Sequence, residues 1–192
     1  ICEGSTFSLA TASASAYDHL LWTTSGTGTF SNDAILNPVY TPSNNDILAG
    51  SVTLTLTAFA LVSCADVPSA MTLNITRQVT VEAGDNATIC QTETFTPNTA
   101  VSQHYSTLLW SHNGSGVLSG ANTLTPVYSP GAGESGTITL TLNAYALSPC
   151  TDVVDQMQLT INEQAQAFAG PTATICEGST FSLATASASA YD

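Results

Sequence analysis

Long stretches of the chain alternate between apolar residues and residues with a hydroxyl group. Apolar side chains occupy every second position in residues 52–58 and again in residues 138–144, mostly with Thr between them. A period of two predicts strands that bury one face and expose the other. Gly and Pro punctuate the chain at short intervals, and no segment keeps a 3.6-residue period over helical length. The pattern therefore predicts an all-β fold built as a β-sandwich.

The sequence repeats at two spacings. Residues 1–18 and 175–192 are identical, and a weaker repeat lies at half that spacing, because the Leu-Leu-Trp of residues 20–22 recurs at 108–110. The repeating unit is about 87 residues long. We expect a first repeat at residues 1–82 with a shortened first strand and a second at 83–168. Residues 169–192 begin a third repeat like the first, so we expect the sequence to be a window from a longer tandem array.

The seam between the first two repeats is expected near residue 82. Residues 79–90 should form the first strand of the second repeat, leading through Cys90 into its second strand. The segment at the seam is too short and too strand-like to act as a flexible linker.

Core positions follow from the alternation and from the repeat. Trp22 and Trp110 are equivalent, and a Trp in a sandwich strand is more often core than surface. The alternative is that both rings are exposed and stack on a sugar. The expected core residues are Trp22, Trp110, Leu54, Leu56, Leu140 and Leu142.

The charge balance narrows the range of partners. The 192 residues contain one Lys or Arg, namely Arg77, against 14 Asp and Glu, so the formal net charge is -13. A chain with this balance cannot neutralise phosphates, which argues against nucleic-acid binding and against docking on anionic membranes. No apolar run approaches the roughly 20 residues of a membrane span, so no direct membrane insertion is expected in this segment.

Four runs along the chain carry a resemblance to a known family. They are Cys-Glu-Gly-Ser-Thr-Phe-Ser-Leu from residue 2, Leu-Leu-Trp-Thr-Thr-Ser-Gly-Thr-Gly-Thr-Phe from residue 20, Asn-Pro-Val-Tyr-Thr-Pro-Ser from residue 37 and Gly-Ser-Val-Thr-Leu-Thr-Leu-Thr-Ala from residue 50. The chain resembles the PKD-like, immunoglobulin-like tandem repeats of very large surface proteins in gliding and other outer-membrane bacteria. It departs from PKD domains proper because residues 23–26, after Trp22, lack the acidic turn, which puts a calcium role there in doubt.

The resemblance implies a fold, a location and a role. It implies immunoglobulin-like sandwiches arranged end to end in a rod, at the cell surface or outside the cell. The implied function is a non-enzymatic structural repeat of a long filament, stalk or adhesin. The alternative is a carbohydrate- or ligand-binding module of a surface adhesin. The expected partners are neighbouring copies of the same repeat, and filaments with such low-charge, Thr-lined surfaces could also associate side by side.

No cofactor is expected, and candidate metal ligands are weak. Glu82 and Asp85 lie at the seam, where adhesin arrays often hold calcium, but Asp85 aligns with Pro171 and the pair does not recur. There is no Asp-rich calcium loop and no signature of a catalytic nucleophile. Possible glycosylation sequons occur at Asn74, Asn86 and Asn113.

Five cysteines, Cys2, Cys64, Cys90, Cys150 and Cys176, occupy equivalent positions in successive repeats. In an extracellular chain they predict disulfides. The strand order of an immunoglobulin-like sandwich places Cys2 and Cys64 at opposite poles, which favours an inter-repeat bond between Cys2 and Cys150. Cys90 would then await the next repeat, Cys64 would bond the preceding repeat, and Cys176 the following one. Two alternatives remain open: the within-repeat pairs Cys2–Cys64 and Cys90–Cys150, and the pairs Cys64–Cys90 and Cys150–Cys176.

Overall fold

The computed structural model describes residues 1–189, so the last three residues of the expected third repeat lie outside the described part. The chain forms two compact units. The first unit comprises Ile1–Thr80 together with Ser102–Thr107 and Ala144–Val153. The second comprises Val81–Val101, Leu108–Asn143 and Val154–Asp192. The ends of three strands of the second repeat thus belong to the first unit, and the sequence-based boundaries stay a prediction.

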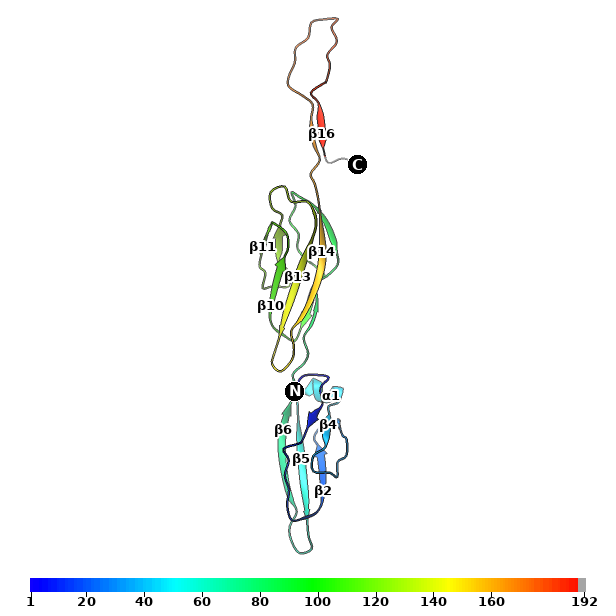
Figure 1. Ribbon diagram of the computed structural model, residues 1–192, viewed down its shortest axis with the longest axis vertical. Helices are drawn as coiled ribbons and strands as arrows, with labels where there is room; N and C mark the ends of the chain where they lie inside the picture. The colour runs from blue at the N-terminus through cyan, green and yellow to red at the C-terminus, as the bar shows by residue number, and fades with distance from the viewer. Residues whose placement is uncertain (190–192) are drawn as a thin grey trace. The chain divides into compact units, whose positions relative to one another are not determined.

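Two antiparallel sheets form the sandwich of the first repeat (Figure 1). One has the order β2-β5-β6, with β2 at Tyr17–Thr24, β5 at Ser51–Ala60 and β6 at Val67–Asn74. The other has the order β1-β4-β3, with β1 at Phe7–Ser8, β4 at Val39–Thr41 and β3 at Thr29–Phe30. The core between them contains Leu9, Leu20, Trp22, Tyr40, Val52, Leu54, Leu56, Leu73 and Ile75. The alternating residues of β5 thus bury the face that their period predicts.

A short helix, α1 at Asn44–Ala49, interrupts the strands of the first repeat. The absence of a helical period did not predict it, because six residues are too few to show one. Its local signals are nevertheless present. Ser43 and Asp46 form a capping box at its start, and Gly50 at its end has a φ of 76°, a left-handed conformation that Gly adopts at little cost.

The second repeat builds a four-stranded sheet with the order β10-β13-β14-β8. Its strands are β10 at Tyr105–His112, β13 at Gly136–Ala146, β14 at Val153–Asn162 and β8 at Ala87–Cys90. A smaller sheet pairs β11 at Val117–Ser119 with β12 at Val127–Ser129, and Phe95 bridges to Tyr128 beside it. The buried residues include Leu108, Trp110, Tyr128, Ile138, Leu140, Leu142, Met157, Leu159 and Ile161.

The single strand expected at residues 79–90 is instead two strands. β7 at Thr80–Glu82 pairs with β9 at Val101–Gln103, and β8 pairs in parallel with β14. Gly84, with a φ of 99°, turns the chain between them. The segment therefore changes its pairing partner part-way, which a simple alternation does not reveal.

The described start of the third repeat contains one further pairing, of β15 at Gln166–Phe168 with β16 at Ser187–Ser189. Over residues 1–189 the structure is nearly all β, with one short helix. The chain thus has the all-β, immunoglobulin-like sandwich fold expected from the sequence. No helix in the described part is long and apolar enough to cross a membrane.

Candidate functional site

A disulfide joins Cys2 to Cys150, and both cysteines belong to the first compact unit. Their Cα atoms are 4.9 Å apart, within the range that a disulfide requires. The pair is 148 residues apart in sequence and links the first repeat to the second. This is the pairing favoured from the sequence. It uses both cysteines, so neither the within-repeat pairs nor the Cys150–Cys176 pair forms in the described structure.

Backbone pairing places the two sulfurs. Cys2 forms a parallel bridge with Thr76, and Cys150 ends a turn closed by its own N–H and the carbonyl of Leu147. The carbonyl oxygens of Thr76 and Arg77 lie 3.4 and 3.5 Å from Cys150 Sγ. The residues that follow β6 therefore hold both halves of the disulfide.

Gln78 also holds this corner, which we call the closed cysteine corner (Cys2, Gln78, Cys150 and Thr151). Its Nε2 donates to the carbonyl of Thr151 at 2.8 Å, and its Oε1 lies 3.1 Å from Cys2 Sγ. The sequence analysis missed Gln78. The signal was available, because Gln78 recurs as Gln164 at the same spacing as Cys64 and Cys150.

The second compact unit contains an equivalent corner without a bond, the open cysteine corner (Cys90, Gln164). The Cys90 thiol donates to Gln164 Oε1 at 3.0 Å, and Cys90 lies beside Asn162 in the β8–β14 pairing as Cys2 lies beside Thr76. A hydrogen bond from the Thr92 hydroxyl, helped by the Thr92 backbone N–H, lowers the pKa of the Cys90 thiol. Among the described residues Cys64, Cys90 and Cys176 are free thiols, and Cys64 and Cys176 are exposed.

A second recurring site lies inside each sandwich. In the first repeat Tyr40 is fully buried, and its hydroxyl donates to Asp46 Oδ2 at 2.8 Å. Asp46 is 1% exposed and accepts two backbone N–H bonds, from Ser43 at 2.9 Å and from Thr27 at 2.9 Å. The buried carboxylate thereby fixes the Gly26–Gly28 loop against the start of α1.

The second repeat contains the same arrangement with Glu in place of Asp. The Tyr128 hydroxyl lies 2.9 Å from both carboxylate oxygens of Glu134, which also accept backbone N–H bonds from Gly131 at 2.8 Å and Ser115 at 2.6 Å. A Cβ atom at Gly114 would collide with this carboxylate, and one at Gly26 would collide with Asp46. The two loops need glycine there because the carboxylates pack directly on the backbone.

These surroundings set the ionisation of both pairs. Burial alone would raise the pKa of the Asp46 and Glu134 carboxyls, but the backbone N–H groups and the tyrosine hydroxyls outweigh it and lower both pKa values. Burial, followed by the hydrogen bond to Glu134, raises the pKa of Tyr128 to about 12. Burial likewise raises the pKa of Tyr40. Each pair is therefore a neutral phenol and an ionised carboxylate near pH 7.

The sequence analysis did not single out these pairs, and it expected both tyrosines at a strand edge. The structure instead buries both rings completely. The signal was the recurrence of a carboxylate six residues after each tyrosine, because Asp46 and Glu134 share the offset of Tyr40 and Tyr128.

The two tryptophans lie in the cores. Trp22 is 5% and Trp110 2% exposed, and their indole Nε1 groups donate to the carbonyls of Leu36 at 3.3 Å and Thr123 at 3.0 Å. Neither ring presents a face to a sugar at the surface. The other expected core residues, Leu54, Leu56, Leu140 and Leu142, are buried as well.

The calcium and glycosylation candidates lie apart from these sites. Glu82 and Asp85 are exposed, and residues 1–189 contain no group of three or more His, Cys, Asp or Glu side chains placed to hold a metal ion. All three sequon asparagines are exposed. Two of them already bind backbone, since Asn86 Oδ1 accepts from Gln158 N at 2.7 Å and Asn113 Oδ1 from Thr139 N at 2.8 Å.

Comparison with known proteins gives matches among solved structures. No family model and no curated protein matches the chain. An I-band fragment of titin matches with a TM-score of 0.47 and 11% identity, over 85% of this chain and 62% of that one. Protocadherin gammaB7 EC3-6 gives 0.37 and 12%, over 79% and 45%. Human protocadherin-24 EC1-2 gives 0.39 and 11%, over 76% and 82%. The chain thus spans less than two thirds of the titin fragment.

Proposed function

We propose that the chain is a non-enzymatic structural repeat of a long extracellular filament, stalk or adhesin, in which a disulfide joins each repeat to the next. The observation that carries the proposal is the Cys2–Cys150 bond between two sequence repeats. Such a bond transmits tension covalently from one repeat to the next, whatever the strength of the non-covalent contacts. A load-carrying surface protein needs that property.

The recurrence of the corner supports the extension to further repeats. Cys90 and Gln164 reproduce the arrangement of Cys2 and Gln78 inside a different compact unit. Under the proposal Cys90 bonds the cysteine equivalent to Cys150 in the next repeat, and Cys64 bonds the preceding one. Every cysteine of the array then has a partner, although three are free in this segment.

The disulfide also supports an extracellular location, because structural disulfides persist in oxidising compartments. The resemblance to PKD-like repeats of large bacterial surface proteins agrees with this location. The second candidate, a carbohydrate-binding module, receives less support because both tryptophan rings are buried. An immunoglobulin-like repeat that works through its connections needs no catalytic group, and on this basis we propose that the chain is not an enzyme.

Non-reducing peptide mapping of the natural protein, isolated from the cell surface with its thiols blocked, tests the proposal. We expect peptides joined through pairs of the Cys2–Cys150 type and no free thiol at positions equivalent to Cys90. A peptide that joins Cys2 to Cys64 would overturn the inter-repeat bond. Recovery of the protein inside the cell, with all its cysteines reduced, would overturn the extracellular role.

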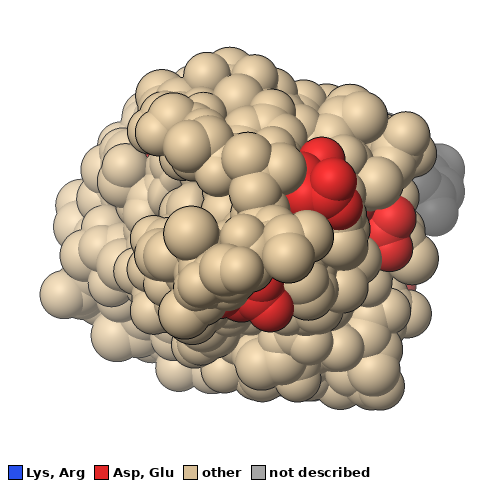
Figure 2. Space-filling model, turned by 90° about the horizontal axis from the view of Figure 1, so that it is seen from below, with Lys and Arg blue, Asp and Glu red and all other residues tan. Residues whose placement is uncertain are grey.

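Side-by-side association of such filaments is part of the proposal. Charged groups are few and almost all acidic, and the face in Figure 2 has separate acidic spots and no basic residue. Because the net charge of -13 opposes contact between copies, salt should favour association by screening it. Light scattering of the protein should rise with ionic strength, and no change with salt would contradict lateral association.

A further inference from the structure

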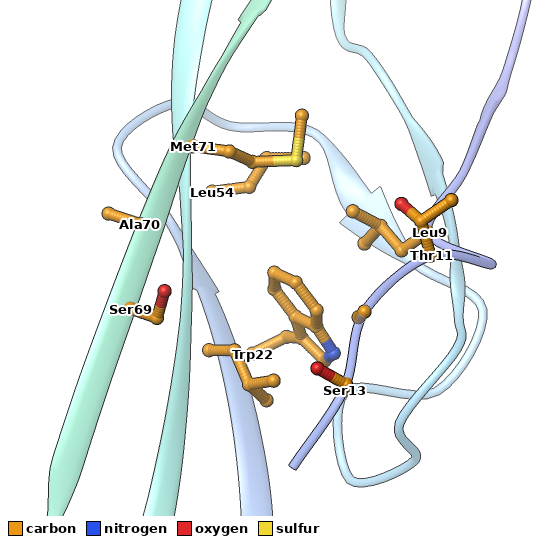
Figure 3. A pocket seen from close by; sticks show the side chains of 10 residues that line it. Leu9, Thr11, Ser13, Trp22, Leu54, Ser69, Ala70 and Met71 are labelled. Carbon is orange, nitrogen blue, oxygen red and sulfur yellow. The ribbon is translucent and has the colours of Figure 1, made fainter.

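The first compact unit has an open groove along one side of its sandwich. Two adjoining pockets of about 260 and about 400 Å³ share Ser13, Leu56 and Ser69 in their walls. One wall is β6, and the other is the segment Leu9–Tyr17, as Figure 3 shows for the first pocket. Trp22 lies at the base with 5% of its surface exposed. We call this cavity the strand groove.

The equivalent segment of the second repeat is already paired. Val101–Gln103 corresponds to Ser13–Ser15 at the 88-residue offset and forms β9, which pairs with β7. Ser102 Oγ also donates to the carbonyl of Thr80 at 2.7 Å. In the first repeat, by contrast, Ser13–Ser15 has no strand partner within the described residues. The strand groove is therefore a sheet edge that lacks one strand.

The chain itself contains the strand that fits this edge. Residues 187–189 have the same Ser-Ala-Ser sequence as residues 13–15, and as β16 they pair antiparallel with β15. The register places Gln166 opposite Ser189, Ala167 opposite Ala188 and Phe168 opposite Ser187. The backbone of this sequence therefore pairs with Gln166–Phe168 where both are present. The same residues in the groove stand without that partner.

We propose that the strand groove binds the Gln166–Phe168 segment of a second copy of this chain, which joins copies head to tail by strand addition. In the register of β15 and β16, Gln166 of the donor lies opposite Ser15 of the acceptor and Ala167 lies opposite Ala14. This goes beyond the proposed function because it concerns association between separate copies through the backbone.

The side chains of the donor suit the groove. In the second repeat the positions equivalent to Ala165 and Ala169 are Val79 and Ala83, which are 2% and 0% exposed. Ala14, which faces the core of the first repeat, would then meet Ala167, another small apolar side chain. The donor therefore presents small apolar side chains to the inner wall of the groove.

Charge and edge chemistry favour this side of the groove. Neither the groove lining nor residues 165–174 contain a charged residue, so the net charge of the two copies is not concentrated at the junction. Pro68 on β6 has no N–H to offer a further strand, which disfavours addition at that wall. Ser13–Ser15 retains its backbone donors and acceptors.

Disulfide trapping tests the register. The full chain is prepared with Cys64→Ser, Cys90→Ser and Cys176→Ser, and a Ser15→Cys, Gln166→Cys pair is added. Directly opposite residues of antiparallel strands have Cα atoms about 4.5–5.5 Å apart, close enough for a disulfide. We expect a ladder of cross-linked dimers and higher oligomers, in amounts that increase with protein concentration.

The matched control is Ser15→Cys with Ala167→Cys, which moves the second thiol to the opposite face of the donor strand. We expect about tenfold less cross-linking, because the two Cβ atoms then point apart. Equal cross-linking in both variants would overturn the register. A bond formed within one chain, independent of concentration, would overturn the second copy as the occupant.

A synthetic peptide of residues 164–173 serves as an independent probe. Added to the trapping reaction, it should compete for the groove and suppress the ladder, whereas the same peptide with Ala167→Pro should not, because proline removes a backbone donor. No cross-linking above the control, together with no binding of the peptide to the unmodified chain, would overturn the proposal. Neither result bears on the Cys2–Cys150 bond, so the two proposals fail separately.

Discussion

The closed and open cysteine corners have the same construction and differ in one group. Cys2 and Cys90 both lie next to a glutamine amide, Gln78 or Gln164, and each is the last residue of a parallel pairing with the strand before that glutamine. At the closed corner Cys150 supplies the second sulfur, and Thr151 supplies an acceptor for the amide of Gln78. At the open corner the amide of Gln164 reaches only the neighbouring carbonyl of Ala165, at 3.3 Å.

This difference shows which part of the corner each repeat provides by itself. The position of the first cysteine and its glutamine follows from strand pairing within one repeat. The second cysteine and the acceptor for the glutamine come from a later repeat. Substitutions at equivalent positions of the two corners should therefore have unequal effects, whereas substitutions of the tyrosine–carboxylate pairs should have similar effects in both repeats.

The largest difference is expected at the cysteines. Cys2→Ser removes a cross-link between residues 148 apart and should lower the free energy of unfolding by about 2–5 kcal/mol, because the unfolded chain regains the freedom that the loop closure removed. Cys90→Ser, at the open corner, should change it by less than about 0.5 kcal/mol. Urea unfolding under oxidising conditions measures both. Equal losses for the two variants would contradict the comparison.

The tyrosine–carboxylate pairs should show the opposite behaviour, with equal losses in the two repeats. Tyr40→Phe and Tyr128→Phe each remove a hydrogen bond to a buried carboxylate and should cost about 1–3 kcal/mol. Tyr17→Phe, at an exposed tyrosine, is the matched control and should cost little. Thermal and urea unfolding provide the measurement. A loss confined to one repeat would show that only one pair supports its loops.

The pairs also illustrate how far the sequence can be interpreted. The alternation of residues 52–58 was enough to predict β5 and its buried face, because burial on one side imposes a period of two. It was not enough to predict Asp46, because a buried carboxylate resembles a surface one until its hydrogen-bond donors are known. Those donors are backbone N–H groups of distant loops, at Thr27 and Ser43, which carry no side-chain signature. The strand change at Gly84 was missed for a similar reason, since pairing partners depend on the whole sheet.

Stability should fall at both extremes of pH. Because the pKa values of Asp46 and Glu134 are lowered in the folded state, their contribution is complete above the ordinary carboxyl range near pH 4 and disappears as the pH falls through the folded values. Because the pKa of Tyr128 is raised to about 12, its contribution is complete below about pH 10 and is lost as the pH rises towards 12.

Unfolding midpoints measured across this range test the signs. Glu134→Gln should flatten the acid limb, and Tyr128→Phe should flatten the alkaline limb, each relative to the unmodified chain. An acid limb that is unchanged when both Asp46→Asn and Glu134→Gln are present would show that other carboxyls cause the loss.

The smallest expected difference concerns the two glutamines. Gln78→Ala removes the hydrogen bond to the carbonyl of Thr151 and one neighbour of the disulfide, and should cost about 0.5–1.5 kcal/mol. Gln164→Ala removes only a bond to the adjacent residue and to a free thiol, and should cost less than about 0.5 kcal/mol in this chain. In a chain extended by a further repeat, the Gln164 amide would gain an acceptor equivalent to Thr151, and the cost of Gln164→Ala should rise to that of Gln78→Ala. Chemical unfolding of the two variants, in the present and the extended chain, measures this change. If the cost of Gln164→Ala stays small in the extended chain while its cysteines are bonded, the glutamine is not part of the connection between repeats.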